Sequence, residues 1–251
     1  MKLLSYNSWL QSQSQKDGIQ LENQVKFYKE AYDFSQKLET LLQNSNHPTF
    51  NHYYQKALSI FHRFAHSVSL RKFNRHIYML ASLYLSAKDN DMFDHTIEID
   101  KYVKCFIVYC KGKEGEDLQS VLIEKIVDAE SHILQMIGYD LNIIVPQVYF
   151  IEAKYKITVQ HGELSKLHES AQNYLNDLFF TNACLYYEPK ILVLCSFQLA
   201  SDNLKMTLSD LDSGEPWYTI FSINEEKQQK DYEEIQELLK YYEQCLQFLE
   251  K

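Results

Sequence analysis

The sequence predicts an all-α protein made of two tandem five-helix bundles with extra helical segments at both ends, and three observations support this. Glycine and proline are scarce, with 6 and 4 among 251 residues, which favours long helices over a loop-rich β fold. Apolar residues recur with a period near 3.6 along most of the chain. The second half also repeats the apolar pattern of the first half.

In the first half, apolar spacing predicts a succession of helices that the loops "NSNHPTF" and "KGKEGED" interrupt. The predicted helices cover residues 21–42, 50–64, 72–87, 99–110 and 118–138. The next stretch, "YDLNIIVPQ", is β-branched and contains Pro146, which disfavours helix at Val145. We therefore expect an extended connector between two domains.

The repeat appears when the chain is shifted by 114 residues. Residues 57–64 then fall on 171–178, and residues 73–87 fall on 187–201 without a gap. Identities are few, but the apolar pattern agrees across two helices and their connection. The predicted organisation is an N-terminal segment (1–19), a first domain (20–141) and a second domain (142–251) that ends in an amphipathic helix.

Charge and cysteine content exclude several classes of protein. The formal net charge is −9 and the three arginines all lie between residues 63 and 75, so nucleic acid is not expected as the primary ligand. The five cysteines contain no C-x-x-C pair and are interpreted as reduced core thiols of a cytosolic or nuclear protein. No apolar stretch or signal-peptide pattern indicates secretion or membrane insertion.

Motifs for catalysis are absent from the sequence. There is no glycine-rich phosphate loop, no H-E-x-x-H and no G-x-S-x-G. His62 and His66 have a spacing that can ligate zinc, but no carboxylate or cysteine accompanies them, so two partly solvated histidines are the preferred interpretation. We expect no metal, no cofactor and no catalytic activity.

The ordered motifs resemble those of cyclins over residues 20 to 245. "FHRF" and "LSAK", at 61–64 and 85–88, match the first cyclin box, "ESHILQMIGYDL" at 130–141 matches its last helix, and "VPQVYF" at 145–150 resembles the start of the second box. "YLNDLFFTNACLYYEPKILVLCSFQLAS" at 174–201 and "PWYTIF" at 216–221 are similar to the transcription-associated K, T and L types, with cyclins C and H next nearest.

The resemblance implies a protein-binding site built around Lys88 and Glu130. Both would contact main chain at the end of the regulatory helix of a cyclin-dependent kinase, and Leu134, Tyr139 and Leu141 would bury apolar surface around them. Tyr139 and Leu141 could equally belong to the core. Lys88 could instead be a solvated helix end and Glu130 an exposed residue without a partner.

The sequence departs from the cyclin pattern in two places. The usual K-x-E-E after the third helix reads "KDND" here, so Asn90 and Asp91 stand where the family has glutamates. The resemblance still implies that Asp91 lies at the kinase interface. The substrate-docking M-R-x-I-L motif of cell-cycle cyclins is not found in the first helix.

The arginines are open to two interpretations. Arg63, Arg71 and Arg75 could dock an acidic or phosphorylated segment. Salt bridges to nearby helices are the preferred interpretation.

The resemblance implies a nuclear, non-catalytic subunit that activates a kinase by holding its regulatory helix inward, with the RNA polymerase II C-terminal tail as substrate. Further complex subunits could join this heterodimer, whereas direct contact with nucleic acid or membrane is not expected. The alternatives are a cyclin-fold scaffold that activates no kinase and a protein related to general transcription factors. A salt-dependent DNA shift assay would identify the latter.

Overall fold

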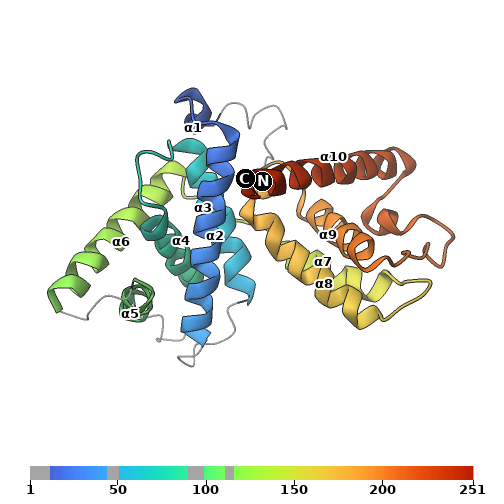
Figure 1. Ribbon diagram of the computed structural model, residues 1–251, viewed down its shortest axis with the longest axis horizontal. Helices are drawn as coiled ribbons and strands as arrows, with labels where there is room; N and C mark the ends of the chain where they lie inside the picture. Colours follow the sequence, from blue (N-terminus) through green and yellow to red (C-terminus); the bar gives the residue numbers. More distant parts are fainter. Residues whose placement is uncertain (1–11, 44–50, 90–98, 111–115, 251) are drawn as a thin grey trace. The chain divides into compact units, whose positions relative to one another are not determined.

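The computed structural model describes residues 12–43, 51–89, 99–110 and 116–250, and their regular structure is helical (Figure 1). Apart from an isolated bridge between Val159 and Leu208, these residues form no β structure. The predicted all-α class is therefore confirmed. The elements are α1 (Gln13–Lys16), α2 (Leu21–Gln43), α3 (Asn51–Ser67), α4 (Arg75–Asp89), α5 (Ile99–Tyr109), α6 (Glu116–Met136), α7 (Gln147–Lys156), α8 (Leu164–Asp177), η2 (Leu178–Phe180), η3 (Ala183–Leu185), α9 (Pro189–Leu204), η4 (Trp217–Phe221) and α10 (Glu225–Leu249).

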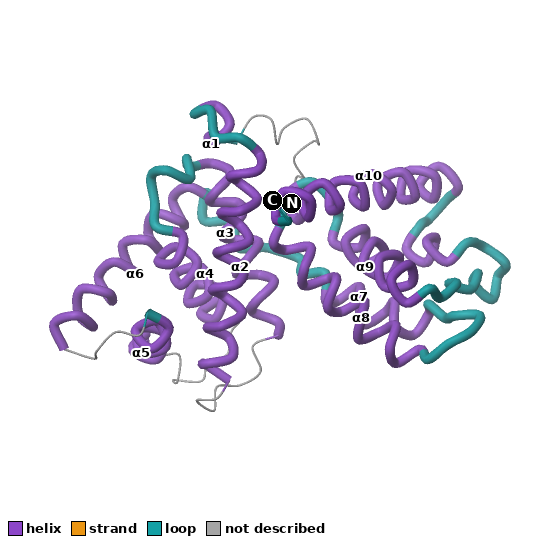
Figure 2. The backbone as a smooth tube through the Cα atoms, viewed as in Figure 1, coloured by secondary structure: helices purple, strands orange, loops and turns teal. Residues whose placement is uncertain are grey.

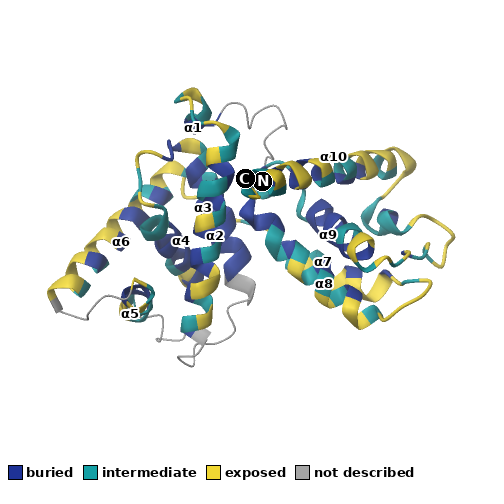
Figure 3. Ribbon diagram, viewed as in Figure 1, coloured by how far each residue is buried: buried dark blue, intermediate teal, exposed yellow. Residues whose placement is uncertain are grey.

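The chain divides into two compact units, the first ending at Ile143 and the second beginning at Ile144. In the first unit α4 is the central helix, because α2, α3 and α6 all pack against it. Eight of the 15 residues of α4 are buried. Figure 3 colours the chain by burial. The predicted boundary between residues 141 and 142 stays a prediction.

The central helix begins later than its apolar pattern predicts. The sequence places its start near Lys72, whereas α4 begins at Arg75. Asn74 explains the difference, because its side-chain oxygen accepts hydrogen bonds from the N–H groups of His76 (2.9 Å) and Ile77 (3.2 Å). An asparagine in this position caps the first turn and fixes where the helix starts.

Aromatic side chains fill the space between α3, α4 and α6. The ring of Phe64 stacks on that of Tyr78 with centroids 4.7 Å apart and meets the edge of Phe73 at 4.9 Å. The Tyr78 hydroxyl is 2.8 Å from Nδ1 of His132 on α6. These contacts combine apolar burial with a hydrogen bond for the one polar atom of the tyrosine ring.

The second unit repeats the helix packing of the first. Here α9 is central and contacts α7, α8 and α10, as α4 contacts α2, α3 and α6. Residues 75–89 shifted by 114 positions cover 189–203, and α9 runs from Pro189 to Leu204. The matched residues Leu80 and Leu194 are both fully buried. The tandem repeat that the sequence predicts is therefore confirmed in the fold.

The expected connector is also present. Residues 140–145 form no helix, and α7 begins directly after Pro146. Proline suits this place because its fixed φ fits the start of a helix and its missing N–H leaves no donor unpaired there. Separately, no described helix has both the length and the apolar character needed to cross a bilayer.

Two expectations about single residue types need correction. His62 is buried rather than partly solvated, with its ring centroid 4.9 Å from that of Tyr28. Cys110 is exposed and is not a core thiol. Cys245 does lie in the core, where burial raises the pKa of its thiol to about 12.

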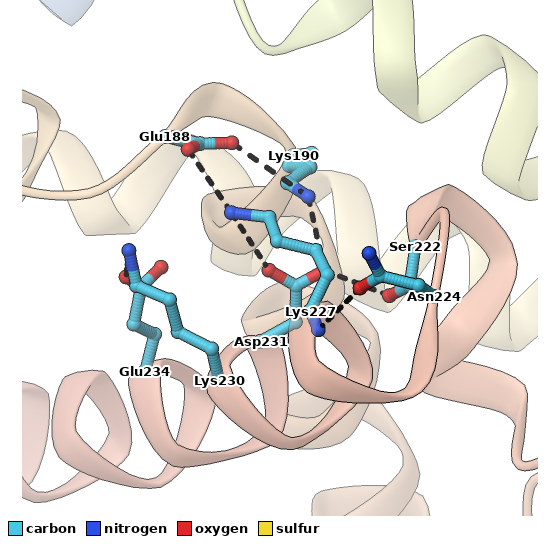
Figure 4. Close-up of polar contacts among 8 residues, drawn as sticks. All are labelled: Glu188, Lys190, Ser222, Asn224, Lys227, Lys230, Asp231 and Glu234. Atoms are coloured by element: carbon cyan, nitrogen blue, oxygen red, sulfur yellow. Dashed lines mark hydrogen bonds and ion pairs between the residues drawn. The ribbon is translucent and has the colours of Figure 1, made fainter.

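A buried group of charges fixes α10 to α9 (Figure 4). The carboxylate of Asp231 is fully buried and accepts hydrogen bonds from the ammonium of Lys190 (2.9 Å) and the hydroxyl of Ser222 (2.8 Å). Lys227 lies 3.5 Å from the other oxygen of Asp231 and 3.3 Å from Glu188. We call Glu188, Lys190, Ser222, Lys227 and Asp231 the α9–α10 charge cluster.

The cluster gives a structural reason for the consecutive residues Tyr187, Glu188 and Pro189. Tyr187 is buried, Glu188 bridges the two lysines of the cluster and Pro189 is the first residue of α9. Burial alone would lower the pKa of Lys227, but the carboxylates of Asp231 and Glu188 outweigh it and raise that pKa. Two cations and two anions thus balance within the cluster.

We expect Asp231→Asn to lower the free energy of unfolding by about 3 kcal/mol, because it leaves the buried Lys190 with one counter-charge fewer. Denaturant titration followed by circular dichroism measures this change. The double variant Asp231→Asn/Lys190→Met removes one charge of each sign and should recover part of the loss. A double variant less stable than Asp231→Asn would contradict the role of charge balance.

Candidate functional site

The structure brings Lys88 and Glu130 together. Lys88 lies in the last turn of α4, Glu130 lies in α6, and their ammonium and carboxylate form an ion pair. The side chain of Glu130 is 10% exposed, whereas that of Lys88 is 43% exposed. Glu130 is therefore neither exposed nor unpaired. Lys88 is the residue of the pair that faces solvent.

Lys88 also contacts an aromatic residue of its own helix. Its ammonium lies 4.9 Å from the centroid of the Tyr84 ring, one helical turn earlier. An ammonium over an aromatic face gains a further attraction. The lysine is thus oriented before any partner arrives, although more than two fifths of its side chain still faces solvent.

The neighbouring residue forms a second ion pair, which the sequence did not reveal. Asp89 pairs with Lys56 of α3, so the end of α4 is tied to α6 by Lys88 and to α3 by Asp89. An aspartate at a helix C-terminus is unfavourable for the helix dipole, and the lysine offsets this. In the sequence, the one sign of this pair is that Lys56 occupies a core-facing position in "YYQKALSI".

The apolar residues predicted around the pair differ in exposure. Leu134 and Leu141 are partly exposed, and Tyr139 is exposed, so Tyr139 is not a core residue. Tyr139 has a φ of +58°, and its N–H donates to the carbonyl of Leu134 at 2.8 Å as α6 ends. A left-handed backbone at a non-glycine residue costs about 1 kcal/mol or more and commonly marks a functional position.

Arg63 fixes the segment that carries Tyr139. Its guanidinium donates to the carbonyl oxygen of Asp140 at 3.0 Å and lies 3.8 Å from the Asp140 carboxylate. The Asp140 side chain in turn accepts a hydrogen bond from the N–H of Asn142 at 3.0 Å. The arginine therefore positions the end of α6 relative to α3.

The other two arginines differ in their surroundings. Arg75 pairs with Glu30 of α2 and lies 5.0 Å from the ring centroid of Phe27, which agrees with the preferred salt-bridge interpretation. Arg71 is exposed. Asp91, the remaining predicted contact residue, lies outside the described residues, as does Asn90.

The chemistry of this surface suits recognition of a protein main chain. A partly exposed lysine can donate to the unpaired carbonyls at the end of a helix, and a carboxylate can accept from backbone N–H groups. Among the described residues, no three His, Cys, Asp or Glu side chains are arranged to hold a metal ion. We call Lys88, Glu130, Leu134, Tyr139 and Leu141 the α4–α6 surface.

The two partners of the Lys56–Asp89 pair should respond unequally to substitution. The Lys56 side chain is 10% exposed and that of Asp89 is 30% exposed, so removing the acid strands the more buried charge. We expect Asp89→Asn to lower the free energy of unfolding by about 1 to 3 kcal/mol, and Lys56→Met to lower it less. Urea titration of both variants checks this order, and the reverse order would contradict it.

No family model matches the chain. Curated relatives include Cyclin-T1-5 of Arabidopsis thaliana, 30% identical over 134 residues, and Cyclin-K of Homo sapiens, 24% identical over 159 residues. These matches cover 53% and 63% of this chain, and 21% and 27% of the relatives. Cyclin pch1 of Schizosaccharomyces pombe is 24% identical over 192 residues, covering 71% of this chain and 51% of the relative. The chain thus spans from about a fifth to about half of the length of these relatives.

The fold also has a counterpart among solved structures. A chain in the structure of the CAK complex from Chaetomium thermophilum bound to ATP-γ-S superposes with a TM-score of 0.60 at 16% identity. The match covers 89% of this chain and 64% of that chain. At this identity the likeness concerns the fold alone. The chain is therefore similar in sequence to cyclins of the T and K types, and it has the all-α fold that this similarity predicts.

Proposed function

We propose that this protein is a non-catalytic regulatory subunit that binds a cyclin-dependent kinase and holds its regulatory helix inward. The ion pair between Lys88 and Glu130 is the observation on which the proposal rests. These are the two residues that the resemblance to cyclins assigns to the kinase contact, and the lysine remains accessible. The similarity to cyclins T and K supports the same assignment.

The proposed contact would activate the kinase by fixing the position of its regulatory helix. A protein kinase needs the glutamate of its regulatory helix paired with the lysine of strand β3 to hold the ATP phosphates. A partner that binds the inward position of this helix more tightly than the outward one shifts the population towards the active form. A shift from 1:99 to 99:1 requires about 5.5 kcal/mol of differential binding.

The surroundings of the pair fit this role. Tyr139 presents an exposed aromatic ring from a segment that Arg63 holds in place. Tyrosine is among the residues enriched at the energetically dominant positions of protein interfaces. Leu134 and Leu141 would supply apolar burial around it.

The similarity to cyclins T and K also suggests where the protein acts and which substrate its kinase has. We propose a nuclear protein whose kinase acts in transcription, on the C-terminal tail of RNA polymerase II. The alternative is a cyclin-fold scaffold that binds a kinase without activating it, and the replacement of two family glutamates by Asn90 and Asp91 favours that alternative. A kinase assay on the co-purified complex, with this tail as substrate, distinguishes the two.

Charge reversal tests the α4–α6 surface. We expect Glu130→Lys to abolish co-purification of the kinase from the source cells while the helical circular dichroism is retained, because the variant places two ammonium groups together. Asp128→Lys is the matched control, since Asp128 is exposed on the same helix and undergoes the same charge change. Equal recovery of kinase with Glu130→Lys and wild type would disprove the assignment.

The double variant Lys88→Glu/Glu130→Lys separates a structural role from a binding role. The swap restores the internal ion pair with its polarity reversed, so stability should return towards that of the wild type. A carboxylate would then face the carbonyls of the kinase helix, and binding should stay lost. Recovery of kinase binding by the swap would mean that the pair serves only to join α4 and α6.

A further inference from the structure

The first helix of the second unit exposes a stripe of large apolar side chains. Val148, Ile151 and Tyr155 of α7 are 62%, 49% and 86% exposed. Their spacing of three and four residues places them on one face of the helix. The other face of α7 is already used, because Phe150 is buried against α9, with its ring centroid 5.4 Å from that of Phe197. We call the three exposed residues the α7 stripe.

The fold itself does not require this stripe. A surface helix normally combines one apolar face towards the core with a polar face towards solvent. In α7 the three apolar residues of the stripe are exposed beside the charged residues Glu152, Lys154 and Lys156. Helix α10 of the same unit follows the normal pattern, since Ile235 and Leu238 are buried and Glu233 and Glu237 are exposed. Contiguous exposed apolar residues on a folded protein commonly mark a site of protein interaction.

The stripe ends at a pocket with an acidic lining. Tyr155 lines this pocket, whose volume is about 440 Å³, and the segment before η4 contributes the acidic residues Asp210, Asp212 and Glu215 to the lining. Lys156 also lines the pocket, but its ammonium already pairs with Glu152 at 2.6 Å. The charge of the pocket therefore favours a cationic group. We call it the acidic pocket.

Main-chain hydrogen bonds join the two loops next to the acidic pocket. The N–H of Ser209 donates to the carbonyl of Thr158 at 2.9 Å, and the N–H of Gln160 donates to that of Thr207 at 3.0 Å. These bonds join the loop after α7 to the loop after α9, both of which are drawn in teal in Figure 2. A pocket formed in advance spares a ligand part of the cost of ordering it.

We propose that the α7 stripe and the acidic pocket together bind a segment of a partner protein that carries apolar side chains followed by an arginine or lysine. The apolar side chains would cover Val148 and Ile151. The cation would pass the ring of Tyr155, which can attract it through its π face, and reach the carboxylates of the pocket. The residues of this site all belong to the second unit, and none of them is part of the α4–α6 surface.

Selection of phage-displayed random dodecapeptides on the full chain tests the proposal. The enriched peptides should combine apolar residues with an arginine or lysine on one side of them. Synthetic copies, measured by fluorescence anisotropy, should bind Ile151→Glu and Asp212→Lys at least about tenfold more weakly than wild type. Binding should also weaken as salt is added, because the pocket contact is electrostatic.

Ile223→Glu is the matched control, because Ile223 is an exposed isoleucine of the same unit that does not line the pocket. It should bind the peptides as wild type does. Tyr155→Ala provides a second variant at the most exposed position of the stripe, should Ile151→Glu fold poorly.

Several outcomes would overturn the proposal. The first is that wild type enriches peptides no more than Ile151→Glu does. The second is that the enriched peptides are acidic. The third is that the peptides bind wild type and the stripe variants with equal affinity. A dimer seen by light scattering that Ile151→Glu abolishes would make a second copy of the chain the occupant. Greater loss of stability in Ile151→Glu than in Ile223→Glu, without loss of peptide binding, would mean that the stripe is covered within the chain.

Discussion

Burial of one central helix per unit is the constraint on which the rest of the structure depends. In the first unit α2, α3 and α6 pack on α4, so the sides of α4 are occupied by apolar contacts along most of its length. Charged side chains can be accommodated only where this packing ends. Lys88 and Asp89 are the last two residues of α4, and each reaches a different neighbouring helix. The position of the candidate site is thus a consequence of how the bundle is packed.

The tandem repeat shows how the two units diverged in their use of charge. The positions of Lys88 and Asp89 correspond to Asp202 and Asn203 in the second unit, where Asp202 accepts a hydrogen bond from Gln198 of its own helix. The second unit instead concentrates its charges at the start of α9, where Glu188 and Lys190 join the α9–α10 charge cluster. The same helix arrangement therefore carries an accessible ammonium in one copy and an internal, balanced cluster in the other.

The sequence predicted those features that depend on local pattern. The helices and the extended connector before Pro146 follow from the pattern of neighbouring residues. The repeat follows from apolar positions that recur at a constant offset along the chain. The pairing of Lys56 with Asp89 and of Arg63 with Asp140 joins positions 33 and 77 residues apart, and no local pattern specifies either partner. The proximity of Lys88 and Glu130 was expected from resemblance alone, and the burial of Glu130 was not expected at all.

Residues that depart from the rules of the fold are the most informative about function. Tyr139 combines an exposed aromatic ring with a left-handed backbone, although glycine would meet the backbone requirement at lower cost. The α7 stripe keeps apolar side chains where solubility favours polar ones. Neither the ring of Tyr139 nor the α7 stripe adds to the buried core of its unit. Features that the free chain does not need are expected to be used in a complex, where the same surfaces become buried.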